Sequence, residues 1–132
     1  MATEKTFYLS TVEAITPHVL LRRQWHEVHF GIDRKDLLES ALNRPKQAAN
    51  FEDADLIKQA ASLCFGLIKN HPWYGGNKRT GTFLLEVFLE MNGFVVSASD
   101  KEMVELALSI DLGKYDAEAI IRWLSKHVER QD

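Results

Sequence analysis

Apolar residues recur every three or four positions over most of the chain, a spacing that places them on one face of an α-helix. The stretch 53–70 shows this pattern most clearly. Its apolar stripe comprises Leu56, Ile57, Ala60, Ala61, Leu63, Cys64, Leu67 and Ile68. We therefore predict a helix over 53–70 that packs against a core and that Pro72 ends.

A second apolar stretch, TFLLEVFLEM, is hydrophobic around most of its circumference. A helix of this kind is normally buried in the middle of a bundle. It should begin near Asn77 and end at Asn92-Gly93, because glycine is common just after the last turn of a helix. We expect Leu67 and Leu85 to be core positions of these two helices.

Capping signals mark two helices in the first third of the chain. Ser10 and Glu13 have the spacing of a capping box, in which a hydroxyl and a carboxylate satisfy free backbone N–H groups. This predicts a helix over 10–26. Asp33 precedes a second helical stretch, which we expect to stop before Pro45 because the residue ahead of a proline is disfavoured in the α region.

Similar signals mark two helices in the last third. Ser99 and Glu102 again have capping-box spacing and predict a helix that runs to about Asp111 and stops at Gly113. Asp116 is a suitable N-cap for a final helix that runs through Trp123 to about residue 129.

The remaining segments are short. Residues 94–96 form an apolar bridge that is long enough for one strand, and 45–52 is the only long loop that we expect between helices. Five or six helices with little strand predict an all-α fold, a compact helical bundle. The length of 132 residues fits one domain over 1–132.

Composition narrows the function classes. The net charge of −3 argues against a nucleic-acid-binding surface, which is usually basic. The single cysteine, Cys64, lies among apolar residues, which indicates a buried thiol in a reducing compartment. The chain has no apolar run long enough to cross a membrane, and its start lacks the apolar stretch of a signal peptide. We expect a cytoplasmic protein that does not contact a membrane.

The stretch HPWYGGNKR, at 71–79, carries the candidate chemistry. Gly75 and Gly76 allow a tight turn and a close backbone approach to a ligand. They precede a helix start, where unpaired N–H groups and the helix dipole favour an anion. Lys78 and Arg79 add positive charge, and the Asn77 amide can bind a phosphate or sugar oxygen or cap the helix. The pattern predicts a phosphate site.

His71 lies just before this phosphate site, and an imidazole can take a proton from an attacking hydroxyl. A base next to a phosphate site is the minimum that transfer of a phosphate-containing group requires. The same residues also fit an ordinary turn between helices, in which His71 caps a carbonyl and Trp73 and Tyr74 fill the core. Spacing alone leaves both interpretations open.

The stretch HPWYGGNKRTG resembles the signature of the Fic/Doc family, and Asn77-Lys78-Arg79-Thr80 is similar to its Doc branch. The flanking stretches LLESALNRPKQ, LIKNHP and FLEMNGF resemble the family in order and spacing. Fic AMP-transferases tend instead to carry Gly-Asn-Gly-Arg at this point. The resemblance covers roughly residues 9–127.

The resemblance implies a compact helical fold and a transferase. Doc proteins are toxins of toxin–antitoxin modules, and the best-known one is a kinase that phosphorylates elongation factor Tu, whereas Fic relatives transfer AMP to hydroxyl groups. Carried over by position, His71 is the general base, and Asn77 and Lys78 hold the nucleotide phosphates with support from Arg79. Gly76 keeps the anion site open. A Phd-like antitoxin is the implied partner, and we expect a groove lined by apolar residues of the first two helices to receive it.

One departure from the family affects the metal. The family's acidic residue, which binds Mg²⁺, is replaced by Gly75. Either the activity of this chain is reduced, which we favour, or the substitution was introduced or selected because the protein is toxic, or another carboxylate replaces it. Asp53, Asp55 and Glu86 are the candidates for that carboxylate. Trp73 in place of the usual Phe is a mild departure.

A few other residues have candidate roles. His26 and His29 lie close together, but no carboxylate or cysteine pattern completes a metal site with them. Arg34 is a candidate for a side chain that faces the active-site groove. Residues expected to pack in the core or to carry surface charge are Trp25, Trp123, Arg22, Arg23 and Lys46.

Overall fold

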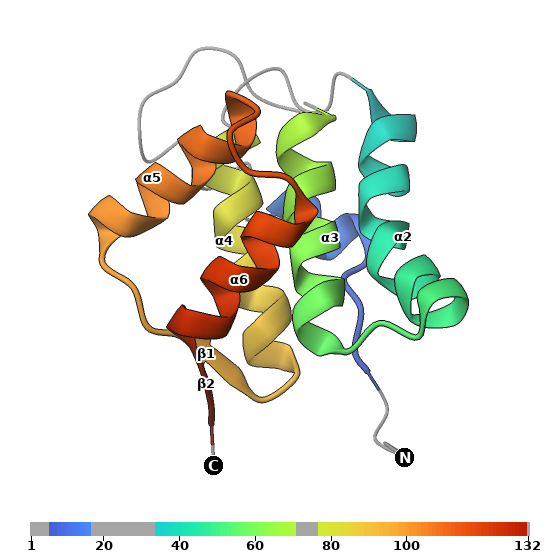
Figure 1. The fold of residues 1–132 in the computed structure, drawn as a ribbon. Helices are drawn as coiled ribbons and strands as arrows, with labels where there is room; N and C mark the ends of the chain where they lie inside the picture. The colour runs from blue at the N-terminus through green and yellow to red at the C-terminus, as the bar shows by residue number, and fades with distance from the viewer. Residues whose placement is uncertain (1–5, 17–33, 71–76, 132) are drawn as a thin grey trace.

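The computed structural model describes residues 6–16, 34–70 and 77–131, and it confirms the mostly helical fold (Figure 1). The labelled helices are α2 (Lys35–Glu52), α3 (Leu56–Lys69), α4 (Asn77–Met91), α5 (Asp100–Asp111) and α6 (Ala117–His127). Residues 11–16 are also helical, and the strands are β1 (Phe94–Val96) and β2 (Val128–Arg130). The predicted helices over 53–70, 77–93 and 99–111 are therefore confirmed to within a few residues.

Helix α3 lies at the centre of the bundle and contacts α2, α4, α5 and α6 (Figure 1). Its predicted stripe is buried from Ala60 to Ile68 and partly buried at Leu56 and Ile57. Leu67 on α3 and Leu85 on α4 are both fully buried, as predicted. The other large side chains that are fully buried are Leu38, Leu63, Ile68, Leu84, Phe88, Leu89, Leu106, Ile110 and Ile120. Every labelled helix therefore contributes side chains to the core.

The last turn of α3 lies beside the first turns of both α2 and α4. The Asn70 side-chain amide donates to the Leu37 carbonyl at 3.1 Å, which joins the end of α3 to the start of α2. A Cβ built on Gly81 would lie 2.8 Å from Cγ1 of Ile68, so only a glycine lets α4 approach α3 this closely. The starts of α2 and α4 therefore lie at one end of the bundle.

The prediction that the second helix stops before Pro45 is wrong, because Pro45 lies inside α2 and residues 45–52 are helical rather than a loop. A proline inside a helix removes one backbone hydrogen bond. Burial outweighs this loss, because one face of α2 is buried continuously from Leu38 through Pro45 to Ala48. The helix ends instead at its C-cap residue, Asp53, which has a φ of 52°. The backbone N–H at this C-cap donates to the Ala48 carbonyl oxygen.

The end of the chain differs from the prediction as well. We expected a helix to about residue 129, but α6 ends at His127 and residues 128–130 form β2, which pairs antiparallel with β1. The Ser97 N–H donates to the His127 carbonyl where the two segments meet. The strand predicted at 94–96 is confirmed, and its partner strand was not predicted. Trp123 packs against the core and stacks on the His127 ring, with 4.0 Å between ring centroids.

Three of the predicted capping interactions are present, whereas Asp33, the predicted start signal of the second helix, lies outside the described residues. Ser10 and Glu13 bond to each other's backbone N–H groups, as do Ser99 and Glu102. Asp116 accepts from the Ala119 N–H. Residues 11–16 follow the first of these caps as a helix, whereas the rest of the predicted helix over 10–26 lies outside the described residues.

Candidate functional site

The predicted site falls partly outside the part of the chain that the structure describes. His71, Gly75 and Gly76 belong to the undescribed residues 71–76, together with Trp73 and Tyr74. The described part of the site is the first turn of α4, which carries Asn77, Lys78 and Arg79. Their proposed roles toward a nucleotide therefore rest on where this turn lies and what surrounds it.

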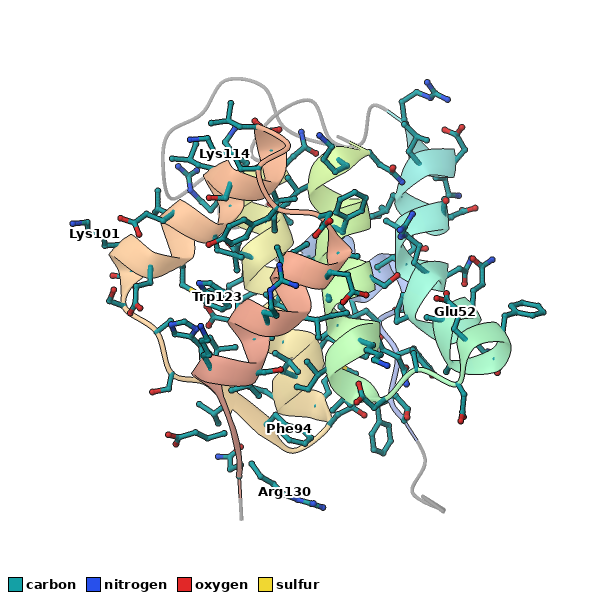
Figure 2. The ribbon with its side chains drawn as sticks, viewed as in Figure 1. Glu52, Phe94, Lys101, Lys114, Trp123 and Arg130 are labelled. Carbon is teal, nitrogen blue, oxygen red and sulfur yellow. The ribbon has the colours of Figure 1, made fainter. Side chains whose placement is uncertain are left out.

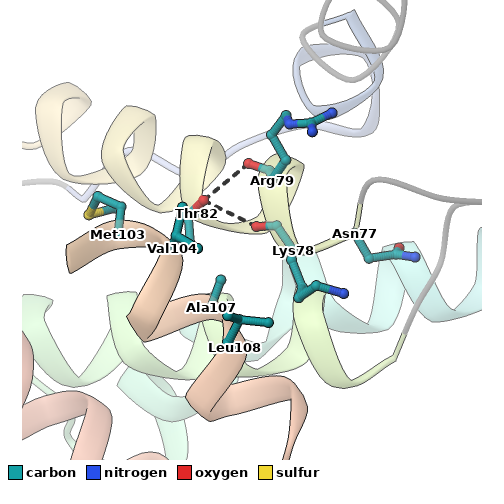
Figure 3. Close-up of a pocket in the computed structure, with 8 residues that line it drawn as sticks. All are labelled: Asn77, Lys78, Arg79, Thr82, Met103, Val104, Ala107 and Leu108. Atoms are coloured by element: carbon teal, nitrogen blue, oxygen red, sulfur yellow. Dashed lines mark hydrogen bonds between the residues drawn. The ribbon is translucent and has the colours of Figure 1, made fainter. Parts of the chain in front are cut away.

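The first turn of α4 is held firmly in place. Thr80 is fully buried, and Gly81 packs closely against Ile68. The Thr82 hydroxyl lies 3.1 Å from both the Lys78 and the Arg79 carbonyl oxygens and can donate to them (Figure 3). Because the first N–H groups of a helix have no partner within the helix, a fixed first turn presents donors and a partial positive charge in a fixed direction.

A cavity of about 380 Å³ opens beside this turn (Figure 3). Helix α4 lines it with polar groups and α5 lines it with apolar side chains. The lining residues are Asn77, Lys78, Arg79, Thr82, Met103, Val104, Ala107 and Leu108. A cavity that is cationic on one side and apolar on the other suits a ligand with both a phosphate and a planar or apolar part.

The two cations of the first turn point in different directions, as Figure 3 shows for Lys78 and Arg79. Neighbouring residues on a helix are about 100° apart, so they cannot share one face. The Lys78 ammonium lies 3.5 Å from a carboxylate oxygen of Asp111, at the end of α5. The Lys69 ammonium donates to the Asp111 backbone carbonyl at 3.5 Å. Asp111 thus joins the end of α3, the start of α4 and the end of α5.

The structure places the three carboxylates considered as replacements for the metal ligand away from the first turn of α4. Asp53 ends α2, and Asp55 caps the start of α3 by accepting from the Lys58 N–H. Both therefore lie at the opposite end of α3 from Asn70. Glu86 lies about 14 Å along α4 from Asn77, at about 1.5 Å per residue. Among the described residues, no group of three or more His, Cys, Asp or Glu side chains could hold a metal ion.

Glu86 nevertheless has an unusual environment. Its half-buried position raises the pKa of its carboxyl above the ordinary value, and the negative charges of Glu90 and Asp100 raise it further. A carboxyl with a raised pKa destabilises the fold where it is ionised, so the penalty grows as the pH rises through its pKa in the folded state. The position therefore disfavours a negatively charged side chain at neutral pH.

We predict that Glu86→Gln raises the melting temperature at about pH 7.5, because it removes an ionised group from an unfavourable site. The gain should disappear near pH 4, where the wild-type carboxyl becomes protonated. Thermal unfolding followed by circular dichroism at both pH values measures this. Glu105→Gln, an exposed position on α5, is the matched control. A gain at pH 7.5 that persists unchanged at pH 4 would contradict the electrostatic explanation.

The other residues with a candidate role lie apart from the cavity or outside the described ranges. Arg34 lies at the start of α2, at the same end of the bundle as Asn77, where it forms an ion pair with Asp36 at 2.8 Å; it does not line the cavity. Burial raises the pKa of the Cys64 thiol to about 12, which keeps it protonated and unreactive. Trp25, His26 and His29 lie outside the described ranges. Among the described helices, none is long and apolar enough to span a membrane.

A comparison with protein families shows which family the chain belongs to. The sequence model of the Fic/DOC family matches residues 8–89, which include α2, α3, most of α4 and the stretch 71–79. This chain belongs to the Fic/DOC family. The comparison with curated proteins found no relative that matches this chain. Fic/DOC membership implies a transferase that takes nucleotide or phosphate groups from nucleoside triphosphates.

Sequence reasoning missed the α5 side of the cavity. Val104 and Leu108 are exposed apolar residues four positions apart on α5. Ordinary amphipathic helices show the same spacing, so the sequence pattern did not indicate a cavity. Asp111 was identified only as a helix end, and nothing nearby in the sequence relates it to Lys78. Both features depend on how α5 packs against α4.

Proposed function

We propose that this chain is a Doc-like toxin of a toxin–antitoxin module. It transfers phosphate from a nucleoside triphosphate such as ATP to a hydroxyl of a target protein similar to elongation factor Tu, and it thereby blocks translation. The observation that carries this proposal is the first turn of α4, where Asn77, Lys78 and Arg79 border a cavity with an apolar wall. The order Asn-Lys-Arg-Thr at 77–80 supports the Doc branch rather than the Fic branch.

The proposed reaction is an in-line displacement at the γ-phosphorus. The target hydroxyl oxygen bonds to phosphorus, His71 takes the hydroxyl proton, and the bond from phosphorus to the β–γ bridging oxygen breaks to release ADP. The phosphates lie against the N–H groups at the start of α4 and against Gly75, Gly76 and Lys78, with Arg79 in support. Phosphoryl transfer needs mainly positioning and charge neutralisation from the protein.

The metal of the family does not fit the residues present. Gly75 offers no carboxylate, and no cluster of the described residues supplies a replacement. Since Mg²⁺ normally neutralises charge on the transferred phosphate, we propose that the activity of this chain is weakened. A catalytically silent relative that binds a nucleotide or a partner is the second candidate, and Gly75 is the observation that favours it.

The proposed partners follow from the Doc assignment. A Phd-like antitoxin whose disordered segment folds on the toxin would restrain it, and both would act in the cytoplasm. The net charge of −3 supports a role without direct nucleic-acid contact, so the antitoxin would be the DNA-binding subunit.

Mass spectrometry of elongation factor Tu, after incubation with ATP and magnesium, tests the proposal. We expect a slow gain of one phosphoryl group with the wild-type chain and a much faster gain with Gly75→Asp. No phosphate with Gly75→Asp would contradict the kinase proposal, and an added AMP would place the chain in the Fic class. Calorimetry with ATP separates the silent relative, which would bind ATP regardless of magnesium and show no turnover.

A further inference from the structure

Asp111 occupies a position that ordinary helix electrostatics disfavours. It is the last residue of α5, where the helix dipole places partial negative charge, so a carboxylate here is repelled by its own helix. The side chain is also mostly shielded, with 22% of it exposed. Its compensation comes from other helices, because the Lys78 ammonium lies 3.5 Å from its carboxylate and the Lys69 ammonium 3.5 Å from its backbone carbonyl.

The two partners of this ion pair differ in how freely they can move. The Lys78 side chain is 45% exposed at the wall of the cavity, on a long flexible stem, whereas Asp111 is short and mostly enclosed. An ion pair this open to water is weak. A phosphate that enters the cavity can therefore draw the Lys78 ammonium away from Asp111, while Asp111 itself stays in place.

We propose that Asp111 is a positioning residue that competes with the ligand's phosphate for the Lys78 ammonium and so sets the affinity of the cavity for nucleotides. This inference rests on the proposed function, since it concerns the same phosphate site. Without a ligand, Asp111 holds Lys78 at the cavity wall. With a ligand, the ammonium has to leave Asp111 in order to reach the phosphate. This competition weakens binding of the nucleoside triphosphate and of the diphosphate product.

Isothermal titration calorimetry with magnesium-free ATP tests this competition. We expect Asp111→Asn to bind ATP about three- to five-fold more tightly than the wild type, the range that a partly exposed ion pair allows. Asp111→Ser should give a similar gain, because it also removes the charge. Asp100→Asn is the matched control, since it removes the same charge from the opposite end of α5 and should leave the affinity unchanged.

A double-mutant cycle shows whether the effect passes through Lys78. Lys78→Gln should bind ATP more weakly than the wild type, and adding Asp111→Asn to Lys78→Gln should change the affinity less than about 1.5-fold. A merely structural role of Asp111 would not produce this dependence on Lys78. Thermal unfolding of each variant checks that it is folded at the temperature of the titration.

Three outcomes would overturn the inference while leaving the proposed function intact. They are unchanged or weaker ATP binding by both Asp111 variants, an equal gain from Asp100→Asn, and a gain that survives in the Lys78→Gln background. Weaker binding of ATP by Asp111→Asn only when magnesium is present would instead identify the carboxylate as a metal ligand, which also overturns the inference. If none of these proteins, including the wild type, binds ATP, the proposed function fails together with it.

Discussion

Phe88→Ala is expected to lower the free energy of unfolding by about 3–5 kcal/mol, the usual loss when a buried phenylalanine is truncated. Phe88 is fully buried in the last turn of α4, and its ring centroid lies 6.2 Å from that of Tyr8. The truncation removes its apolar contacts and leaves a cavity that the packed helices cannot fill completely. Urea unfolding followed by circular dichroism measures the loss.

Phe83 provides the matched control, because it lies on the same helix but is 40% exposed. Phe83→Ala should lower the free energy of unfolding by less than about 1 kcal/mol. Leu67→Ala and Leu85→Ala, at fully buried positions, should each lower it by about 2–5 kcal/mol. Equal losses for Phe83→Ala and Phe88→Ala would contradict the packing of the Phe88 face of α4 into the core.

His71→Ala is expected to reduce phosphate transfer at least about 100-fold in the Gly75→Asp background, because it removes the proposed general base. The fold should remain, with a melting temperature within about 2 °C of the parent, since the proposed role involves no core contact. Transfer to elongation factor Tu, followed by mass spectrometry, measures the first quantity, and thermal unfolding measures the second.

His29→Ala in the same background is the control, because His29 has no proposed part in transfer. It should retain the parent's rate. If His71→Ala fails to fold, the alternative interpretation of His71 as a structural cap gains support. If it folds and transfers phosphate at the parent's rate, another group accepts the proton and the proposed mechanism is wrong.

The proposals about the site share one structural basis. A buried helix keeps its first turn in a fixed position, so Asn77 and the N–H groups beside it do not need a ligand to order them. Pre-organised donors of this kind bind developing or fixed negative charge with little reorganisation. The flexible element is the Lys78 side chain, which is why the competition with Asp111 bears on affinity rather than on the fold.

The sequence by itself determined the features that act within one or two helical turns. The capping pairs Ser10–Glu13 and Ser99–Glu102 located two helix starts, and Gly93 and Gly113, both with positive φ, followed two helix ends. The apolar stripe of α3 and the apolar run of α4 correctly predicted the two helices that bury the most residues. The expectation that α4 lies in the middle of the bundle is met only in part, because α3 occupies the centre and Phe83 of α4 is exposed. The motif at 71–81 identified the family, which the match over residues 8–89 bears out.

Only the tertiary structure decided the features that join distant segments. Pro45 stays helical because burial along α2 outweighs one lost hydrogen bond, and residues 128–130 leave the helix because β1 offers them a partner. The apolar wall of the cavity and the Asp111–Lys78 ion pair exist because α5 packs against α4. Periodicity and capping report on neighbours in the chain, whereas these contacts depend on which helices meet in space.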